Sequence, residues 1–120
     1  MKENYPIFEK WTKILDWILA TVEKYPKNAR FTISTKIANM ALEVMEKIIE
    51  AIYTKNRLYI LQSINLYIEK LRVFFRISME RRYISIRQYE YIINELNETG
   101  MMVGGWLKVE TNRKSIPADN

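Results

Sequence analysis

Apolar residues recur at alternating steps of three and four in four segments of the chain, which is the spacing of one face of an α-helix. The segments span residues 6–25, 32–54, 58–82 and 85–107, and short polar stretches separate them. The clearest stripe lies in the third segment and consists of Leu61, Ile64, Ile68, Leu71 and Phe75. Short links imply antiparallel neighbours. We therefore predict an all-α, up-down-up-down four-helix bundle over residues 1–109 and a polar C-terminal tail over residues 110–120, frayed from Ser115 onward.

Particular residues mark where these helices begin and end. Pro26 predicts a break after the first helix, because the residue before a proline avoids the helical region. Thr32 or Ser34 is a candidate cap for the second helix. Ser85, followed three residues later by Gln88, matches a capping box, in which each side chain satisfies a backbone N–H of the other residue. This pair predicts the start of the fourth helix.

The first segment has more apolar surface than one packed face requires. Ile7, Ile14 and Trp17 lie off its main stripe, so the apolar face is unusually wide. The main stripe consists of Phe8, Trp11, Leu15, Ile18, Val22 and Tyr25. The three additional residues are expected to need a further packing partner.

The glycine-rich stretch from Gly100 to Lys108 is open to two interpretations. Its Val-Gly-Gly-Trp sequence is compatible with a tight β-hairpin turn, and each glycine in a helix costs about 1 kcal/mol relative to alanine. The helical stripe nevertheless keeps its phase through this stretch, so we favour a helix in which the glycines allow another helix to approach closely. That stripe consists of Tyr89, Ile93, Leu96, Val103 and Leu107.

Composition narrows the chemistry that the bundle can perform. The 120 residues include no cysteine and no histidine, which excludes most zinc sites, Ser-His triads and Cys-His dyads. The carboxylates lie mostly off the apolar stripes, and Gly104-Gly105 lacks the spacing of a phosphate-binding loop. We therefore expect no enzyme activity, no cofactor or metal, and no small-molecule substrate.

The sequence also carries signals about location and charge. No apolar run reaches the roughly 18 residues needed to span a bilayer, and the first residues are charged where a signal peptide would be apolar. We therefore expect a cytoplasmic protein without a membrane partner. The formal net charge of +5 favours an anionic partner.

Basic residues concentrate in the third segment and in the links. Arg72 and Arg76 lie one helical turn apart and project together, and two interpretations remain open for them. They form a salt-bridge ladder with Glu69 and Glu80, or they contact phosphates through their planar guanidinium groups. Four further cations lie in the first and third links. They are Lys27 and Arg30 after the first helix, and Arg81 and Arg82 after the third. We expect these two links at different ends of the bundle, so that the third helix's face and the links need not form one patch within a monomer.

Four strings in the chain resemble one protein family. They are YPKNARFT, LRVFFRIS, ISIRQYEYIINELNETG and GMMVGGWLK, of which the Gly-Gly-Trp-Leu-Lys ending and the Leu-Arg-x-x-x-Arg pair are the most specific. The resemblance covers about residues 10–108. The family comprises four-helix bundles. It includes the accessory variability determinant of diversity-generating retroelements and related proteins encoded in intervening sequences of bacterial large-subunit ribosomal RNA. The retroelement branch is the more similar.

The resemblance implies a function that the helical periodicity does not show. It implies a homopentameric barrel of bundles that binds a reverse transcriptase and its template-repeat RNA and supports mutagenic synthesis of complementary DNA, without being an enzyme. By position, it assigns nucleic-acid or partner binding to Arg72, Arg76 and Arg30, and local charge adds Arg81, Arg82 and Lys27. A pentamer would also cover the additional apolar residues of the first segment and the glycines of the fourth. No arginine follows Gly100, where the family commonly has one.

Two alternatives remain open at this point. The chain is related to the ribosomal intervening-sequence branch, or it is a self-assembling structural or protein-interaction bundle with no nucleic-acid role. The type of RNA bound and the gene diversified do not follow from the sequence.

Overall fold

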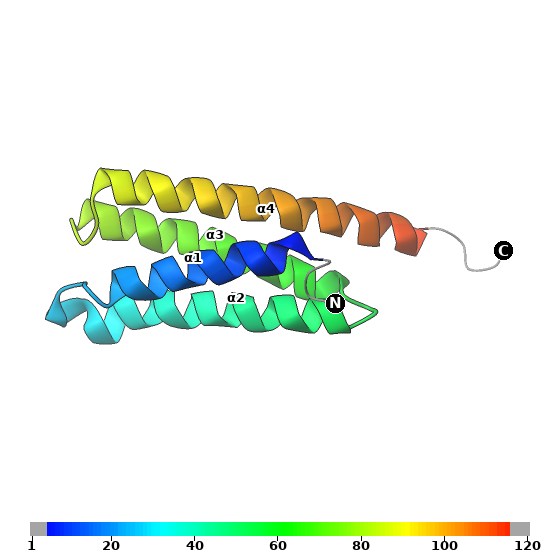
Figure 1. Cartoon of the computed structure of the whole chain (residues 1–120), viewed down its shortest axis with the longest axis horizontal. Helices are drawn as coiled ribbons and strands as arrows, with labels where there is room; N and C mark the ends of the chain where they lie inside the picture. Colours follow the sequence, from blue (N-terminus) through cyan, green and yellow to red (C-terminus); the bar gives the residue numbers. More distant parts are fainter. Residues whose placement is uncertain (1–4, 116–120) are drawn as a thin grey trace.

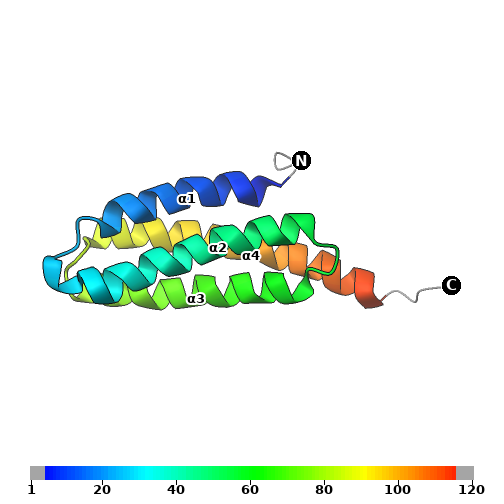
Figure 2. The same ribbon diagram turned by 90° about the horizontal axis from the view of Figure 1, so that it is seen from below.

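Four antiparallel α-helices lie side by side and alternate in direction, as Figures 1 and 2 show from two sides. The computed structural model describes residues 5–115, and the side chains of residues 5–113. The helices are α1 (Pro6–Val22), α2 (Thr35–Tyr53), α3 (Leu58–Glu80) and α4 (Ile86–Ser115). The described residues contain helices and no strand, so the predicted all-α four-helix bundle is confirmed.

The helix interpretation of the glycine-rich stretch is also confirmed, because α4 continues without interruption from Ile86 to Ser115. The boundary expected at residue 109 therefore falls inside a helix. The rest of the expected tail, residues 116–120, lies outside the described residues. Glu110 shows why the helix continues past Val109. Its side chain is 5% exposed, and its Oε2 lies 4.0 Å from Nε of Arg57 and 3.5 Å from Nη1 of Arg113.

The links between helices follow the predicted turns in part. Ser85 and Gln88 form the capping box, with Gln88 N donating to Ser85 Oγ at 3.1 Å and Ser85 N donating to Gln88 Oε1 at 2.8 Å. The caps expected for the second helix are wrong. A 3₁₀ turn, η2 (Lys27–Ala29), and a π-helical turn, η3 (Arg30–Ser34), run directly into α2. The chain is already helical there, so Ser34 Oγ instead donates to the carbonyl of Val22 at 2.9 Å and ties η3 to α1.

The core corrects two expectations about the helical stripes. Ile7 and Ile14 need no subunit interface, because both are buried inside the bundle at 4% and 0% exposure. The indole of Trp17 is half-buried within the same subunit, with its ring centroid 6.3 Å from that of Phe75 and 5.1 Å from that of Tyr91. The helix α1 packs against α2 and α4, and Trp17 also reaches Phe75 of α3, so a wide apolar face is covered within one chain.

The core face of α4 is rotated by about one residue from the predicted stripe. It consists of Ile92, Leu96, Thr99 and Val103, while Tyr89, Ile93 and Leu107 lie half-buried at its edges. Thr99 occupies a buried position because its hydroxyl donates to the carbonyl of Glu95 at 2.8 Å, which satisfies the polar group. The pattern of apolar residues alone does not predict that such a polar position is buried.

A polar tie joins α1 to α4. Lys10 Nζ lies 3.1 Å from Oε1 of Glu95 and 2.7 Å from Oε1 of Glu98. Burial alone would lower the pKa of Lys10, but the hydrogen bonds to Glu98 and Glu95 and their negative charge outweigh burial and raise it. The stabilisation from this tie is therefore present below the unfolded pKa of Lys10, and is lost only as the pH rises through the folded pKa.

The expectation that the glycines allow close approach of a helix is wrong within the subunit. A Cβ on Gly104 or Gly105 would meet no atom within 4 Å. At Gly100 a Cβ would lie 3.1 Å from Nη2 of Arg72, so this glycine makes room for a side chain and not for a backbone.

We predict that removing the capping box lowers stability. Ser85→Ala should reduce the free energy of unfolding by about 1 kcal/mol, because the N–H of Gln88 loses its acceptor. Ser85→Asp keeps an acceptor and should leave stability nearly unchanged. Urea denaturation followed by circular dichroism measures both, and an equal loss in the two variants would contradict the assignment.

We also predict that two of the glycines are destabilising. Gly104→Ala and Gly105→Ala should each raise the free energy of unfolding of the isolated subunit by up to about 1 kcal/mol, because alanine is the better helix former and the space is open. Gly100→Ala should gain less, because its Cβ presses on Arg72. Denaturation under conditions where the chain is monomeric tests this order, and a loss of stability at residue 104 or 105 would show that the space is not open.

Candidate nucleic-acid interface

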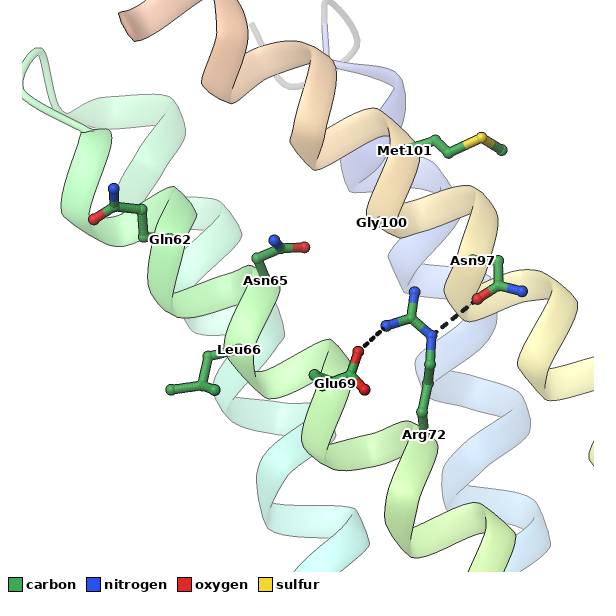
Figure 3. Close-up of a pocket in the computed structure, with 8 residues that line it drawn as sticks. All are labelled: Gln62, Asn65, Leu66, Glu69, Arg72, Asn97, Gly100 and Met101. Atoms are coloured by element: carbon green, nitrogen blue, oxygen red, sulfur yellow. Dashed lines mark hydrogen bonds and ion pairs between the residues drawn. The ribbon is translucent and has the colours of Figure 1, made fainter.

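Arg72 is anchored in a groove between α3 and α4, as Figure 3 shows. Its Nε donates to Oδ1 of Asn97 at 2.9 Å, and its Nη1 donates to Oε1 of Glu69 at 2.5 Å. Its Nη2 faces Gly100. Arg72 thus joins two helices, and its side chain is only 28% exposed.

The salt-bridge interpretation of the third helix is confirmed as two separate pairs. Arg72 pairs with Glu69, and Arg76 pairs with Glu80 at 3.2 Å between Nε and Oε2. The second pair is exposed at both partners, so it contributes at most a few tenths of a kcal/mol. These pairs leave little uncompensated charge on the part of α3 that the sequence singled out.

The links after α1 and α3 lie at the same end of the bundle, which corrects the expectation that they lie at different ends. Both views show the two links together, and the rings of Tyr25 and Tyr83 join them with centroids 5.3 Å apart. The reason is geometric, because each antiparallel helix reverses the direction of the chain and alternate links therefore return to one end.

We call this region the basic end and define it by four exposed cations, Lys27, Arg30, Arg81 and Arg82. Among the described side chains, no carboxylate forms an ion pair with any of the four. This separates them from Arg72 and Arg76. The charge pattern of the sequence indicates these four residues but not that they lie at one end of the bundle. The alternation of short links was the signal that predicts it.

Arg82 adopts a backbone conformation that residues other than glycine rarely adopt. Its φ is 64°, in the left-handed region that favours glycine. The α3 helix ends there in a Schellman motif, with Arg82 N bonded to the carbonyl of Met79 at 3.0 Å and Tyr83 N to that of Ser78 at 2.8 Å. Arginine in place of glycine costs roughly 1 kcal/mol at such a position. The chain thus has an arginine at position 82, although glycine there would make the folded protein more stable.

The remaining groups at the basic end orient the arginines. Arg81 Nε donates to the hydroxyl of Tyr83 at 2.9 Å, and the guanidinium carbon lies 5.5 Å from the centre of that ring. Tyr25 is buried beneath, and burial raises the pKa of its hydroxyl. The guanidinium of Arg81 can therefore donate hydrogen bonds to an anion from a surface in which the tyrosine rings are held in place.

The described residues hold no group of three or more His, Cys, Asp or Glu side chains that could bind a metal ion. Within the same part of the chain, no helix is both long and apolar enough to cross a membrane.

Comparison with known proteins supports the fold and identifies the family. A crystal structure of a protein with unknown function from the S23 ribosomal protein family of Bacteroides thetaiotaomicron superposes with a TM-score of 0.80 at 19% sequence identity. The match covers 90% of this chain and 99% of that one. No curated protein matches the sequence significantly. The family model described as bAvd-like matches residues 6–110, nearly the whole bundle, and the chain therefore belongs to the bAvd-like family.

Proposed function

We propose that this protein is a non-catalytic accessory factor of a diversity-generating retroelement, which binds the element's reverse transcriptase and template RNA to support mutagenic synthesis of complementary DNA. Membership of the bAvd-like family supports the retroelement context and the reverse-transcriptase partner. The charge distribution of the subunit supports the RNA partner. The protein's contribution in this proposal is positioning and electrostatic attraction, with no chemical step of its own.

The observation that carries the RNA-binding part is the basic end. Four exposed cations from two links lie at this end, and among the described side chains none of them forms an ion pair with a carboxylate. One of them, Arg82, has a backbone conformation that favours glycine. Uncompensated cations release condensed counterions when they bind phosphates, whereas paired ones must first give up an ion pair. We therefore assign the main phosphate contacts to the basic end, and a lesser part to Arg72 and Arg76.

We further propose that the subunits assemble into a homopentamer, in which five basic ends act together. Exposed apolar residues recur every seven positions along α3, and such residues lie close to one face of a helix. They are Tyr59, Leu66 and Val73, which are 81%, 55% and 50% exposed. Leu66 and the 71% exposed Met101 of α4 border the same groove (Figure 3). This α3–α4 face takes the place of Ile7, Ile14 and Trp17 as the candidate subunit contact. Repeated weak phosphate contacts then gain affinity by multivalency.

Replacing Arg82 by glycine tests the proposed interface. Arg82→Gly should raise the free energy of unfolding by about 1 kcal/mol, because glycine adopts φ 64° without strain. The same variant should weaken RNA binding and reduce the slope of log affinity against log salt concentration by about 0.7–0.9, the loss of one phosphate contact. Fluorescence anisotropy with labelled template RNA over a salt series measures this.

The matched control is Arg76→Gln, which removes an exposed arginine that is already paired with Glu80. It should change the salt slope less than Arg82→Gly does. If the order is reversed, the main contact lies on α3 and not at the basic end. If the wild-type protein binds no RNA even at low salt, the chain is a self-assembling bundle without a nucleic-acid role.

Light scattering tests the assembly. The wild-type protein should have five times the subunit mass of 14.4 kDa, and Leu66→Glu should reduce that mass because a charge cannot be buried unpaired in an apolar contact. Leu42→Glu is the control, since Leu42 is 41% exposed but lies on α2. Equal effects of the two variants would remove the α3–α4 face from the proposal.

A neighbouring reverse-transcriptase gene with template and variable repeats would identify the retroelement branch. A location inside a ribosomal RNA gene would identify the other branch.

A further inference from the structure

Phe31 is the most exposed large apolar residue in the described part of the chain, at 87% exposure. Its ring carries no polar atom that would benefit from water, and the other phenylalanines of the bundle are buried or half-buried. An exposed phenylalanine of this kind gains free energy whenever a partner covers its ring.

The backbone that presents Phe31 is held in place on both sides. Phe31 belongs to η3, the π-helical turn, where the hydroxyl of Thr35 donates to the carbonyl of Arg30 across the turn. The hydroxyl of Ser34 bonds to the end of α1, and Ile33 packs against the core. The ring is therefore carried by a fixed helical turn and not by a long loop, which lowers the entropy lost when a partner covers it.

The surroundings of Phe31 decide between classes of partner. Arg30 is its neighbour in the chain, Lys27 lies in the preceding turn, and Arg81 and Arg82 lie at the same end of the bundle. A flat apolar ring beside cations that lack a carboxylate partner complements a single strand of nucleic acid, which offers phosphates and unpaired base faces together. A duplex offers phosphates but keeps its base faces stacked inside the helix. An apolar pocket on a protein would use the ring but leave the cations unpaired.

We propose that Phe31 stacks on an unpaired base of an RNA strand whose phosphates contact the basic end, so that this end binds single-stranded RNA in preference to duplex. The proposal rests on the RNA-binding function proposed above and adds the form of the RNA that is recognised. Because every base has a flat face, such stacking gives affinity without strong preference for sequence. The cations hold the strand through its phosphates, and the ring stacks only on a base that is not paired.

The experiment compares two labelled RNAs of about 12 nucleotides per strand, one single-stranded and one duplex, by fluorescence anisotropy over a salt series. Phe31→Ala should weaken binding of the single strand by about 5- to 150-fold, the range for loss of one stacked base. Its salt slope should not change, since stacking releases no counterions. Duplex binding should stay at the wild-type level. Circular dichroism verifies that each variant folds.

Three further variants sharpen the result. Phe31→Trp keeps a flat ring and should retain affinity for the single strand, whereas Phe31→Leu keeps the apolar character without the ring and should lose it. Tyr53→Ala is the matched control, because Tyr53 is an exposed aromatic residue, 59% exposed, that ends α2 at the opposite end of the bundle and lies outside the proposed subunit contact. It should leave RNA binding unchanged.

Several outcomes would overturn the stacking proposal. They are unchanged single-strand binding by Phe31→Ala, an equal loss for strand and duplex, and full retention of single-strand affinity by Phe31→Leu, which would show that RNA binding needs no flat ring at this position. The proposed function fails separately. If Phe31→Ala binds like wild type while Arg82→Gly loses affinity and salt slope, the basic end stands without stacking. If the wild-type protein binds neither RNA, both proposals are wrong.

Discussion

Short links between long helices are the constraint on which the rest of this structure depends. A link of a few residues cannot return the chain along the length of a helix, so each helix must run antiparallel to the one before it. The first and third links then share one end although the whole of α2 and α3 separates them in the chain. This shared end is the reason why cations from two links lie on one surface. Among the described residues, it is the only surface where cations from two links lie together without an ion pair. The functional proposal follows from the connectivity and not from any single motif.

Within this connectivity, a few polar ties fix how the helices are placed relative to one another. Apolar stripes are tolerant of small rotations, because many rotamers fill the same volume. The tie of Lys10 to α4, the tie of Arg72 to Asn97 and the pairing of Arg57 with Glu110 each require one register. Trp11 adds a fourth tie by donating to the carbonyl of Ala41 at 3.0 Å. A buried or half-buried polar group without its partner is strongly penalised, so these contacts select one arrangement among similar ones.

The sequence predicts the architecture well and the site in part. Helical periodicity predicted the number of helices, and the short links predicted their alternating direction, but α4 runs past the boundary expected at residue 109. Ser85 with Gln88 marked the start of α4 correctly. The periodicity misplaced the core face of α4, because Thr99 and Glu110 are polar by type but satisfied where they are buried. It also treated Ile7 and Ile14 as surplus, since a stripe drawn on one helix cannot show how much of its surface the neighbouring helices cover. The charge pattern indicated the four cations of the basic end, Lys27, Arg30, Arg81 and Arg82. The left-handed conformation of Arg82 and the exposure of Phe31 depend on backbone geometry, which the residue types alone do not predict.

The π-helical turn at the start of α2 has a consequence for how this fold tolerates change over evolution. A π turn is equivalent to an α-helical turn that has gained one residue, and the extra residue is absorbed locally. The apolar stripe of α2 that begins at Ile37 keeps its phase with the core whatever happens before Thr35. Conversion of this turn between π and α geometry can therefore take up a change of one residue without repacking the bundle. Such a change would move Arg30 and Phe31, while the helices behind them would keep their packing.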